Sequence, residues 1–133
     1  MQLTSVRIIT GDIDRLTSFY EQVTGLVASR PARQFAEFVG ETATLAIGSA
    51  ETMALFSAGA AVPGENRTVI LEFRVEDVDQ EYARLRPLLA EVVQEPTTMP
   101  WGNRSLLFRD PDGNLVNLFA PQTEEARARL AGV

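Results

Sequence analysis

The sequence predicts a single α+β domain over residues 1–133, built from two copies of a β-α-β-β-β unit. Two observations carry this prediction. A strand followed by a helix with aspartate at its N-cap occurs twice, at Asp12 and at Asp77. When these aspartates are superimposed, residues 8–14 align with residues 73–79, so that the apolar Ile8 and Ile13 fall on Phe73 and Val78. A chain of 133 residues suffices for one hydrophobic core.

The first unit is expected over about residues 1–58. Alternating residues indicate a strand over 3–10, and apolar residues at helical spacing indicate a helix between Asp12 and Gly25. Three short strands are then expected at 27–30, 34–39 and 43–47, separated by Pro31 and by a Gly40–Glu41 turn.

The second unit is expected over about residues 67–121, after a linker that contains Gly and Pro. It repeats the order of the first, with a strand over 68–75 and a helix from Asp77 to Leu89. Three further strands are expected at 91–94, 104–109 and 115–120, the last two joined by the hairpin turn 110–114. A short helix with Thr123 as its N-cap is expected over 123–131.

Composition excludes several classes of site. The chain has no Cys, which removes thiolate chemistry, and no His, which removes the commonest metal ligand and general base. A net charge of −6 disfavours nucleic acid as a partner. There is no signal segment and no apolar run of membrane-spanning length, so we expect a cytoplasmic protein without a membrane partner.

Several short segments resemble a known family. They are residues 12–14, 18–20, 24–26, 73–79, 100–102 and 108–115. Together they are similar to the vicinal oxygen chelate superfamily, which includes glyoxalases, bleomycin-resistance proteins and dioxygenases. The resemblance runs from about residue 3 to 121. It implies a curved mixed-sheet half-barrel with helices outside, a ligand or metal inside, and a homodimer of paired half-barrels.

The resemblance also implies where a metal would bind, and these positions have lost their ligands. Members that use a metal carry His seven residues before each helix-opening aspartate, a carboxylate on the last strand and a fourth ligand in unit one. The residues at these positions are Ser5, Ile70, Asn117 and Ala46. Because a transition-metal site needs several His, Cys or carboxylate donors, we expect no such metal and no cofactor. Mg²⁺ or Ca²⁺ bound by Glu72 and Asn117 is a minor alternative.

Strand alternation and the resemblance together predict a ligand site. Its predicted residues are Arg7, Glu72, Arg74, Trp101 and Asn117, with Ser5 and Ile70. Arg7 and Glu72 either pair with each other or contact ligand, and Trp101 either closes the site as a lid or packs on its own sheet. The phenylalanines are expected mainly in the core: Phe38, Phe56, Phe108 and Phe119.

Three functions remain open at this point. The lost metal ligands favour a metal-free protein that binds an aromatic or cationic small molecule, as drug-resistance members of the family do. The alternative is an enzyme, a relative of the lyases, isomerases or dioxygenases, that uses a hard cation or Glu72 as general base. A third possibility is a partner-binding module whose cavity is filled by its own side chains.

Overall fold

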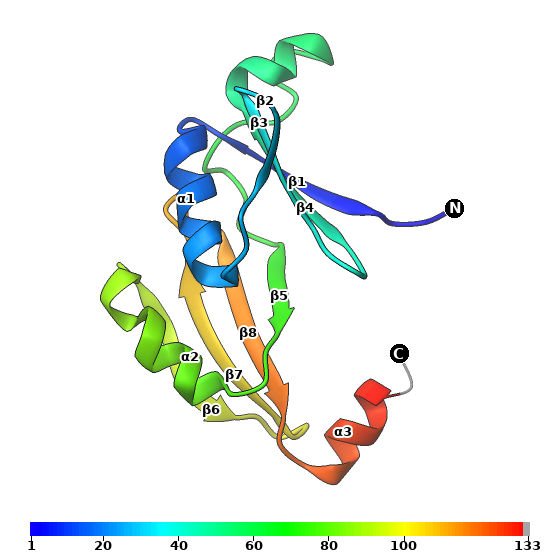
Figure 1. Cartoon of the computed structure of the whole chain (residues 1–133), viewed down its shortest axis with the longest axis vertical. Coiled ribbons are helices and arrows are strands. Elements are labelled where there is room, and N and C mark those ends of the chain that lie inside the picture. Colours follow the sequence, from blue (N-terminus) through cyan, green and yellow to red (C-terminus); the bar gives the residue numbers. More distant parts are fainter. Residues whose placement is uncertain (132–133) are drawn as a thin grey trace. The chain divides into compact units, whose positions relative to one another are not determined.

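The computed structural model describes residues 1–131 and divides the chain into two compact units (Figure 1). The first unit comprises Met1–Asn66 and the second begins at Arg67. Each contains one mixed four-stranded sheet with a helix packed on it. The α+β fold and the internal repeat are therefore confirmed.

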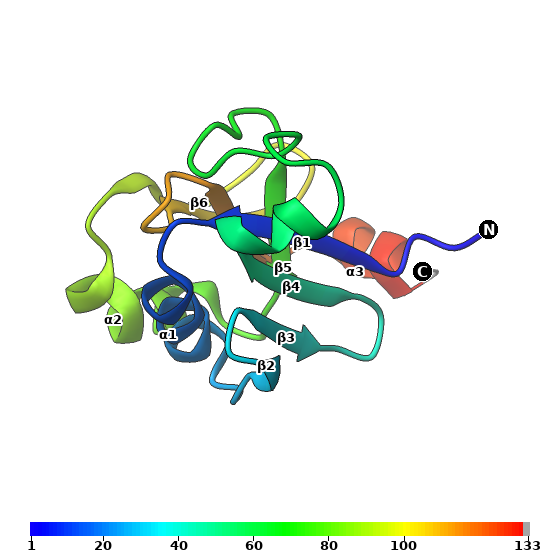
Figure 2. The same ribbon diagram turned by 90° about the horizontal axis from the view of Figure 1, so that it is seen from above.

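The sheet of unit one has the strand order β1-β4-β3-β2 (Figure 2). Its elements are β1 (Ser5–Thr10), α1 (Ile13–Thr24), β2 (Ser29–Ala32), β3 (Phe35–Val39), β4 (Thr44–Ser49) and the 3₁₀ helix η1 (Ala50–Leu55). Strands β1 and β4 are parallel, and the other neighbours are antiparallel. The sheet is mixed because parallel strands such as β1 and β4 need a long crossover connection, which contains α1, whereas antiparallel neighbours can be joined by short turns.

Helix α1 begins and ends where its capping residues stand. The Asp12 carboxylate accepts a hydrogen bond from the Arg15 N–H at 3.1 Å. Gly25 has a φ of 73° and donates its N–H to the Glu21 carbonyl at 2.9 Å, a left-handed cap that glycine adopts without steric cost. The buried side of the helix, which includes Leu16 and Tyr20, packs on β3 and β4.

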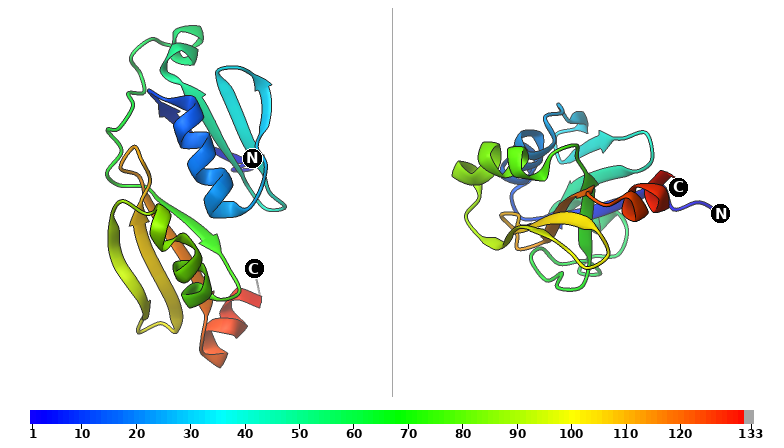
Figure 3. Two further views of the ribbon diagram at one scale, coloured as in Figure 1. Left: turned by 60° about the vertical axis from the view of Figure 1, so that its left-hand side comes forward. Right: turned by 90° about the horizontal axis from the view of Figure 1, so that it is seen from below.

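Unit two repeats this topology with the strand order β5-β8-β7-β6 (Figure 3). Its elements are β5 (Ile70–Arg74), α2 (Val78–Leu85), the 3₁₀ helix η2 (Arg86–Leu88), β6 (Val92–Thr98), β7 (Asn103–Arg109), β8 (Leu115–Pro121) and α3 (Glu124–Ala131). Strands β5 and β8 are parallel, as β1 and β4 are in unit one. The same strand order in both units is what a duplicated β-α-β-β-β unit requires.

Helix α2 is fixed to its sheet by apolar packing and by an ion pair at its first turn. Val78 and Leu85 are buried, and the helix packs on β6, β7 and β8. Arg104 of β7 donates to both carboxylate oxygens of Asp79, at 2.7 and 2.8 Å. These hydrogen bonds hold the pKa of the Asp79 carboxyl below its usual value.

Two element boundaries differ from prediction because of proline. Pro31 was expected to separate strands, but it lies within β2, which is an edge strand where the missing N–H costs no ladder hydrogen bond. The second helix was expected to reach Leu89, but α2 ends at Leu85 and continues as η2, because Pro87 lacks an N–H and restricts the residue before it.

The terminal helix α3 begins as expected, with the Thr123 hydroxyl accepting from the Ala126 N–H at 3.1 Å. It packs on β8, and its Ala126 is buried. No helix within residues 1–131 is long and apolar enough to cross a membrane.

Candidate functional site

In each unit the strand register separates a sheet face that packs on the helix from a face that points away from it. In unit one Leu45 and Ile47 are buried beneath α1, while Arg7 and its register partner Ala46 belong to the other face. In unit two Leu118 is buried beneath α2, and Glu72 and Asn117 lie on the other face. We call these the α1-distal and α2-distal faces, and they carry most of the predicted site residues.

Arg7 is held on the α1-distal face by two aromatic rings. Its guanidinium carbon lies 4.8 Å from the centroid of the Phe35 ring and 5.5 Å from that of Phe56. Such contacts are attractive because the face of an aromatic ring is electron-rich. Phe56 follows directly after η1, and 68% of its surface is exposed, so its expected place in the core was wrong. The contact leaves the planar edge of the Arg7 guanidinium free to donate hydrogen bonds.

Small residues on β4 allow η1 to close against this face. A Cβ added to Gly48 would lie 3.0 Å from Thr52 Oγ1 and 3.4 Å from Ile9 Cδ1. Thr52 belongs to η1 and donates its hydroxyl to the Ser49 carbonyl at 2.7 Å. A larger residue at 48 would therefore have to displace the Thr52 side chain of η1, the helix that Phe56 follows.

The centre of the α2-distal face is a hydrogen-bonded pair between neighbouring parallel strands. Asn117 Nδ2 donates to Glu72 Oε2 at 2.8 Å. A carboxylate only accepts hydrogen bonds, so the amide of Asn117 must turn its nitrogen toward Glu72. Asn117 Oδ1 is left buried with no hydrogen-bond partner among the described residues. The pair therefore presents one unsatisfied acceptor beside an exposed carboxylate.

Arg74 lies on the same face as Glu72, two residues further along β5, and is exposed. Within residues 1–131 its guanidinium makes no hydrogen bond or ion pair. It stands at the carboxyl end of β5, where its register partner on β8 is Phe119.

Trp101 lies in the tight turn between β6 and β7, and its backbone is anchored. Met99 N–H donates to the Asn103 carbonyl at 2.7 Å, and Arg129 of α3 donates to the Trp101 carbonyl at 2.7 Å. Gly102 has a φ of 93°, and a Cβ there would collide with Thr123. These contacts hold the backbone of the turn, and the Trp101 side chain is 54% exposed. Its role as a lid stays a prediction.

Along the strand direction, Trp101 lies near the end of the α2-distal face that carries Arg74. Asn103, which follows the turn, pairs with Pro121 at the carboxyl end of β8. Asn117 is four residues away along that strand, about 13 Å at the usual rise per residue. Trp101 therefore stands closer along the strand direction to the Arg74 end of the face than to the Glu72–Asn117 pair.

The remaining predicted residues lie at the starts of their strands. Ser5 opens β1 and pairs in register with Thr44, and Ile70 opens β5 and pairs with Leu115. Ser5 and Arg7 belong to unit one, whereas the other five predicted residues belong to unit two. An ion pair between Arg7 and Glu72 would join the two units and stays a prediction.

The family-implied metal positions do not fit a transition metal. Ser5 and Ala46 stand in unit one and Ile70 and Asn117 in unit two, so the set offers one hydroxyl, one amide and two hydrocarbon side chains. Within residues 1–131 no three carboxylates gather closely enough to hold an ion, and the whole chain lacks His and Cys. Soft or borderline metals need such donors.

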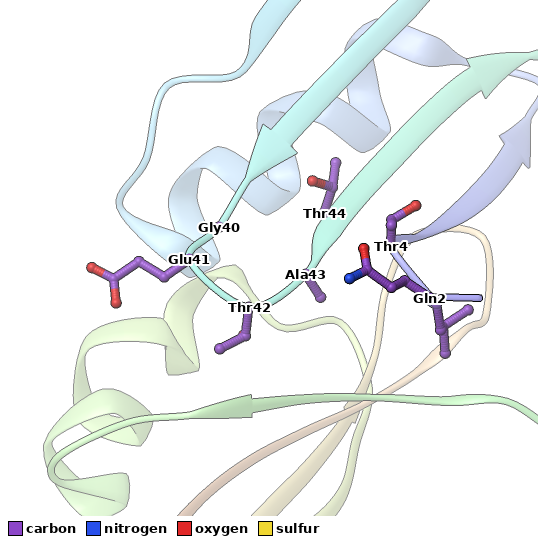
Figure 4. Close-up of a pocket in the computed structure, with 8 residues that line it drawn as sticks. Gln2, Thr4, Gly40, Glu41, Thr42, Ala43 and Thr44 are labelled. Carbon is purple, nitrogen blue, oxygen red and sulfur yellow. The ribbon is translucent and has the colours of Figure 1, made fainter. Parts of the chain in front are cut away.

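A separate pocket of about 490 Å³ lies in unit one, at the start of β1 and the turn between β3 and β4 (Figure 4). Threonine side chains and backbone line most of it, and Glu41 is its one charged residue. None of the predicted site residues lines this pocket. It therefore gives no support to the predicted site.

Comparison with known proteins identifies the family. Residues 2–118 match the family model of the Glyoxalase/Bleomycin resistance protein/Dioxygenase superfamily. The chain belongs to this superfamily. It is also 30% identical over 125 residues to the uncharacterized protein YraH of Bacillus subtilis (strain 168), covering 90% of this chain and 98% of that protein.

Solved structures of the superfamily agree with the fold. A glyoxalase/bleomycin resistance protein/dioxygenase from Nocardioides is 27% identical with a TM-score of 0.74, covering 93% of this chain and 85% of that one. A family enzyme from Burkholderia phytofirmans PsJN has a TM-score of 0.80 at 19% identity, over 91% and 99% of the two chains. At 19% identity, the similarity to the Burkholderia structure shows a shared fold only.

Sequence reasoning missed two features of the site. Phe35 and Phe56 were not assigned to Arg7, because their contact depends on η1 folding back on the sheet. The pairing of Glu72 with Asn117 was also missed, although both residues were predicted. A signal for it existed in the repeat, since β5 and β8 had to be neighbours if the family resemblance held.

Proposed function

We propose that this superfamily member is a metal-free protein that binds a small molecule with an apolar, aromatic body and an N–H or O–H donor. The observation that carries the proposal is the Asn117–Glu72 pair. Asn117 stands at the last-strand position that the family resemblance associates with a metal-binding carboxylate. Its buried Oδ1 has no partner among the described residues and needs a donor.

The carboxylate of Glu72, beside Asn117, favours positively charged hydrogen-bond donors on the ligand over neutral ones. Glu72 is exposed and has no ion pair within residues 1–131. A protonated amine on the ligand would satisfy both Glu72 and Asn117 Oδ1 by charge-assisted hydrogen bonding. Protonated aliphatic amines are therefore the donors that this face favours, and a drug- or metabolite-binding protein would take them on an aromatic body; we call such compounds, with a protonated alkylamine and an aromatic ring, aromatic amines.

The second candidate is an enzyme that uses Glu72 as a general base. Asn117 holds one oxygen of the carboxylate and leaves the other available to accept a proton. A general base must also reach an acidic proton of its substrate. The superfamily includes enzymes, which motivates a test of this second candidate. Glu72→Gln would abolish an activity that uses Glu72 as general base, while the glutamine oxygen would still accept the hydrogen bond from Asn117.

A ligand screen tests the proposed function directly. We expect an aromatic amine to raise the melting temperature of the protein, because a ligand that binds only the folded state stabilises it. Zn²⁺, Mn²⁺, Ni²⁺ and a chelator should leave it unchanged, and dialysed protein should contain no stoichiometric metal. Differential scanning fluorimetry and elemental analysis give both readouts. A metal retained at one equivalent per chain would contradict the proposal.

We also propose that the protein is cytoplasmic and that it forms a homodimer, the latter because the family resemblance implies paired half-barrels. Strands β1 and β5 are sheet edges within their units, and unpaired edges favour association with further strands. Light scattering should give a mass about twice the 14.6 kDa of one chain. A mass of one chain at micromolar concentration would overturn this expectation.

A further inference from the structure

A second group of charged residues lies at the carboxyl ends of the parallel strands β5 and β8. It surrounds a pocket of about 300 Å³ within unit two. The pocket is lined by Arg74, Val75, Glu76, Ala120, Pro121, Gln122 and Arg127. Arg74 ends β5 and Arg127 belongs to α3, so two separate elements each contribute an arginine to the lining of the same pocket.

The two arginines differ from others in this unit. Arg84, Arg104 and Arg109 each have a carboxylate within 4.0 Å. Arg74 and Arg127 are exposed, and neither side chain makes an ion pair or hydrogen bond within residues 1–131. Although the protein has a net charge of −6 and Glu76 lines the same pocket, no carboxylate within residues 1–131 lies within 4.0 Å of either guanidinium group.

We propose that this pocket binds the phosphate group of a phosphate monoester. One guanidinium fork satisfies a carboxylate, whereas a phosphate dianion offers three terminal oxygens that two forks can share. Gln122 supplies a further amide donor at the rim of the pocket. Arg127 becomes a binding residue that the sequence did not indicate.

This phosphate subsite specifies one end of the ligand. The inference rests on the proposed function for the other end, the amine that binds to Glu72 and Asn117. Arg74 lies on the same face as Glu72, two residues or about 7 Å along the strand. A ligand whose amine meets Glu72 and Asn117 can therefore place a phosphate at Arg74 and Arg127. Trp101 stands toward this same end of the sheet, since its turn precedes the register partner of Pro121.

Glu76 gives the proposal a distinctive consequence. It lines the pocket beside the two arginines, and its carboxylate repels an anion bound there. Removing this charge should improve binding of inorganic phosphate, whereas removing a pocket arginine should weaken it. If phosphate affinity responded only to the overall charge of the protein, removing Glu76 would have the same effect as removing an acidic residue elsewhere.

The test is isothermal titration calorimetry with inorganic phosphate at constant ionic strength. The unmodified protein should show saturable binding in the millimolar range, and acetate should bind several-fold more weakly. Arg127→Gln and Arg74→Gln should each weaken phosphate binding about tenfold or more, as the loss of a charged hydrogen bond does. Glu76→Gln should strengthen it. Sulfate, which has the same shape and charge, should compete with phosphate.

The matched control is Arg15→Gln, an exposed arginine of α1 that does not line the pocket. It removes the same charge and should leave phosphate affinity unchanged. Equal weakening by Arg15→Gln and Arg127→Gln, or the absence of saturable phosphate binding, would overturn the subsite. Binding of aromatic amines is measured separately, so a protein that binds phosphate but no amine would retain the subsite and lose the proposed function.

Discussion

Replacing Asn117 with leucine is expected to weaken binding of an aromatic amine by about 5- to 150-fold. Leucine is close to asparagine in size and suits a buried position, but it offers no oxygen to the ligand and no N–H to Glu72. Leaving a buried ligand donor unpaired costs roughly 1–3 kcal/mol, or about 5- to 150-fold in affinity. Calorimetry with the tightest-binding amine of the screen measures the effect.

Two further variants, one at Glu72 and one control, separate the role of the Glu72 charge from that of the Asn117 oxygen in ligand binding. Glu72→Gln keeps an acceptor for Asn117 Nδ2 and removes the charge, so a protonated amine should bind more weakly while a neutral N–H donor should bind nearly as before. Ser18→Ala changes an exposed hydroxyl on α1 and should have no effect. If Asn117→Leu has the same melting temperature and the same affinity as the unmodified protein, the ligand does not use the α2-distal face.

The largest expected effect on stability comes from the turn that joins β7 and β8. Asp110 is 4% exposed, and its carboxylate accepts hydrogen bonds from the N–H groups of Asp112 and Asn114 and from Asn114 Nδ2, each at 2.9 Å. Gly113 completes the turn with a φ of 89°. Asp110→Ala should lower the free energy of unfolding by about 3 kcal/mol, because it leaves buried donors unsatisfied.

Urea denaturation measures this change through the transition midpoint, provided that the slope of the transition is unchanged. Asp110→Asn retains one oxygen acceptor and should cost about half as much. The control is Asp14→Ala, which removes an exposed carboxylate that lies 3.3 Å from Arg30 and should change stability by less than about 0.5 kcal/mol. Equal effects of Asp110→Ala and Asp14→Ala would show that the hydrogen bonds of Asp110 do not stabilise the turn.

The helix starts and the turn after Asp110 were predictable from the sequence because each is stabilised by hydrogen bonds between residues that are close in the chain. Asp12 and Asp77 cap their helices by bonding an N–H three residues away, and the turn after Asp110 is closed by its own side chain. The errors came from proline, whose effect depends on context. Pro31 is tolerated in β2 because the strand lies at an edge, which the sequence does not reveal.

The sequence by itself determined the repeat, the order of strands and helices along the chain, the family and the absence of His and Cys, since these depend on residue identity and short-range spacing. The tertiary structure decided which side chains meet. Glu72 and Asn117 are 45 residues apart, and Arg7 contacts Phe56 only because η1 folds back over Gly48. Arg127 reaches the pocket of Arg74 through the packing of α3 on β8. Such contacts depend on which strands are neighbours in a sheet and on how the helices dock, which residue identity and short-range spacing alone do not specify.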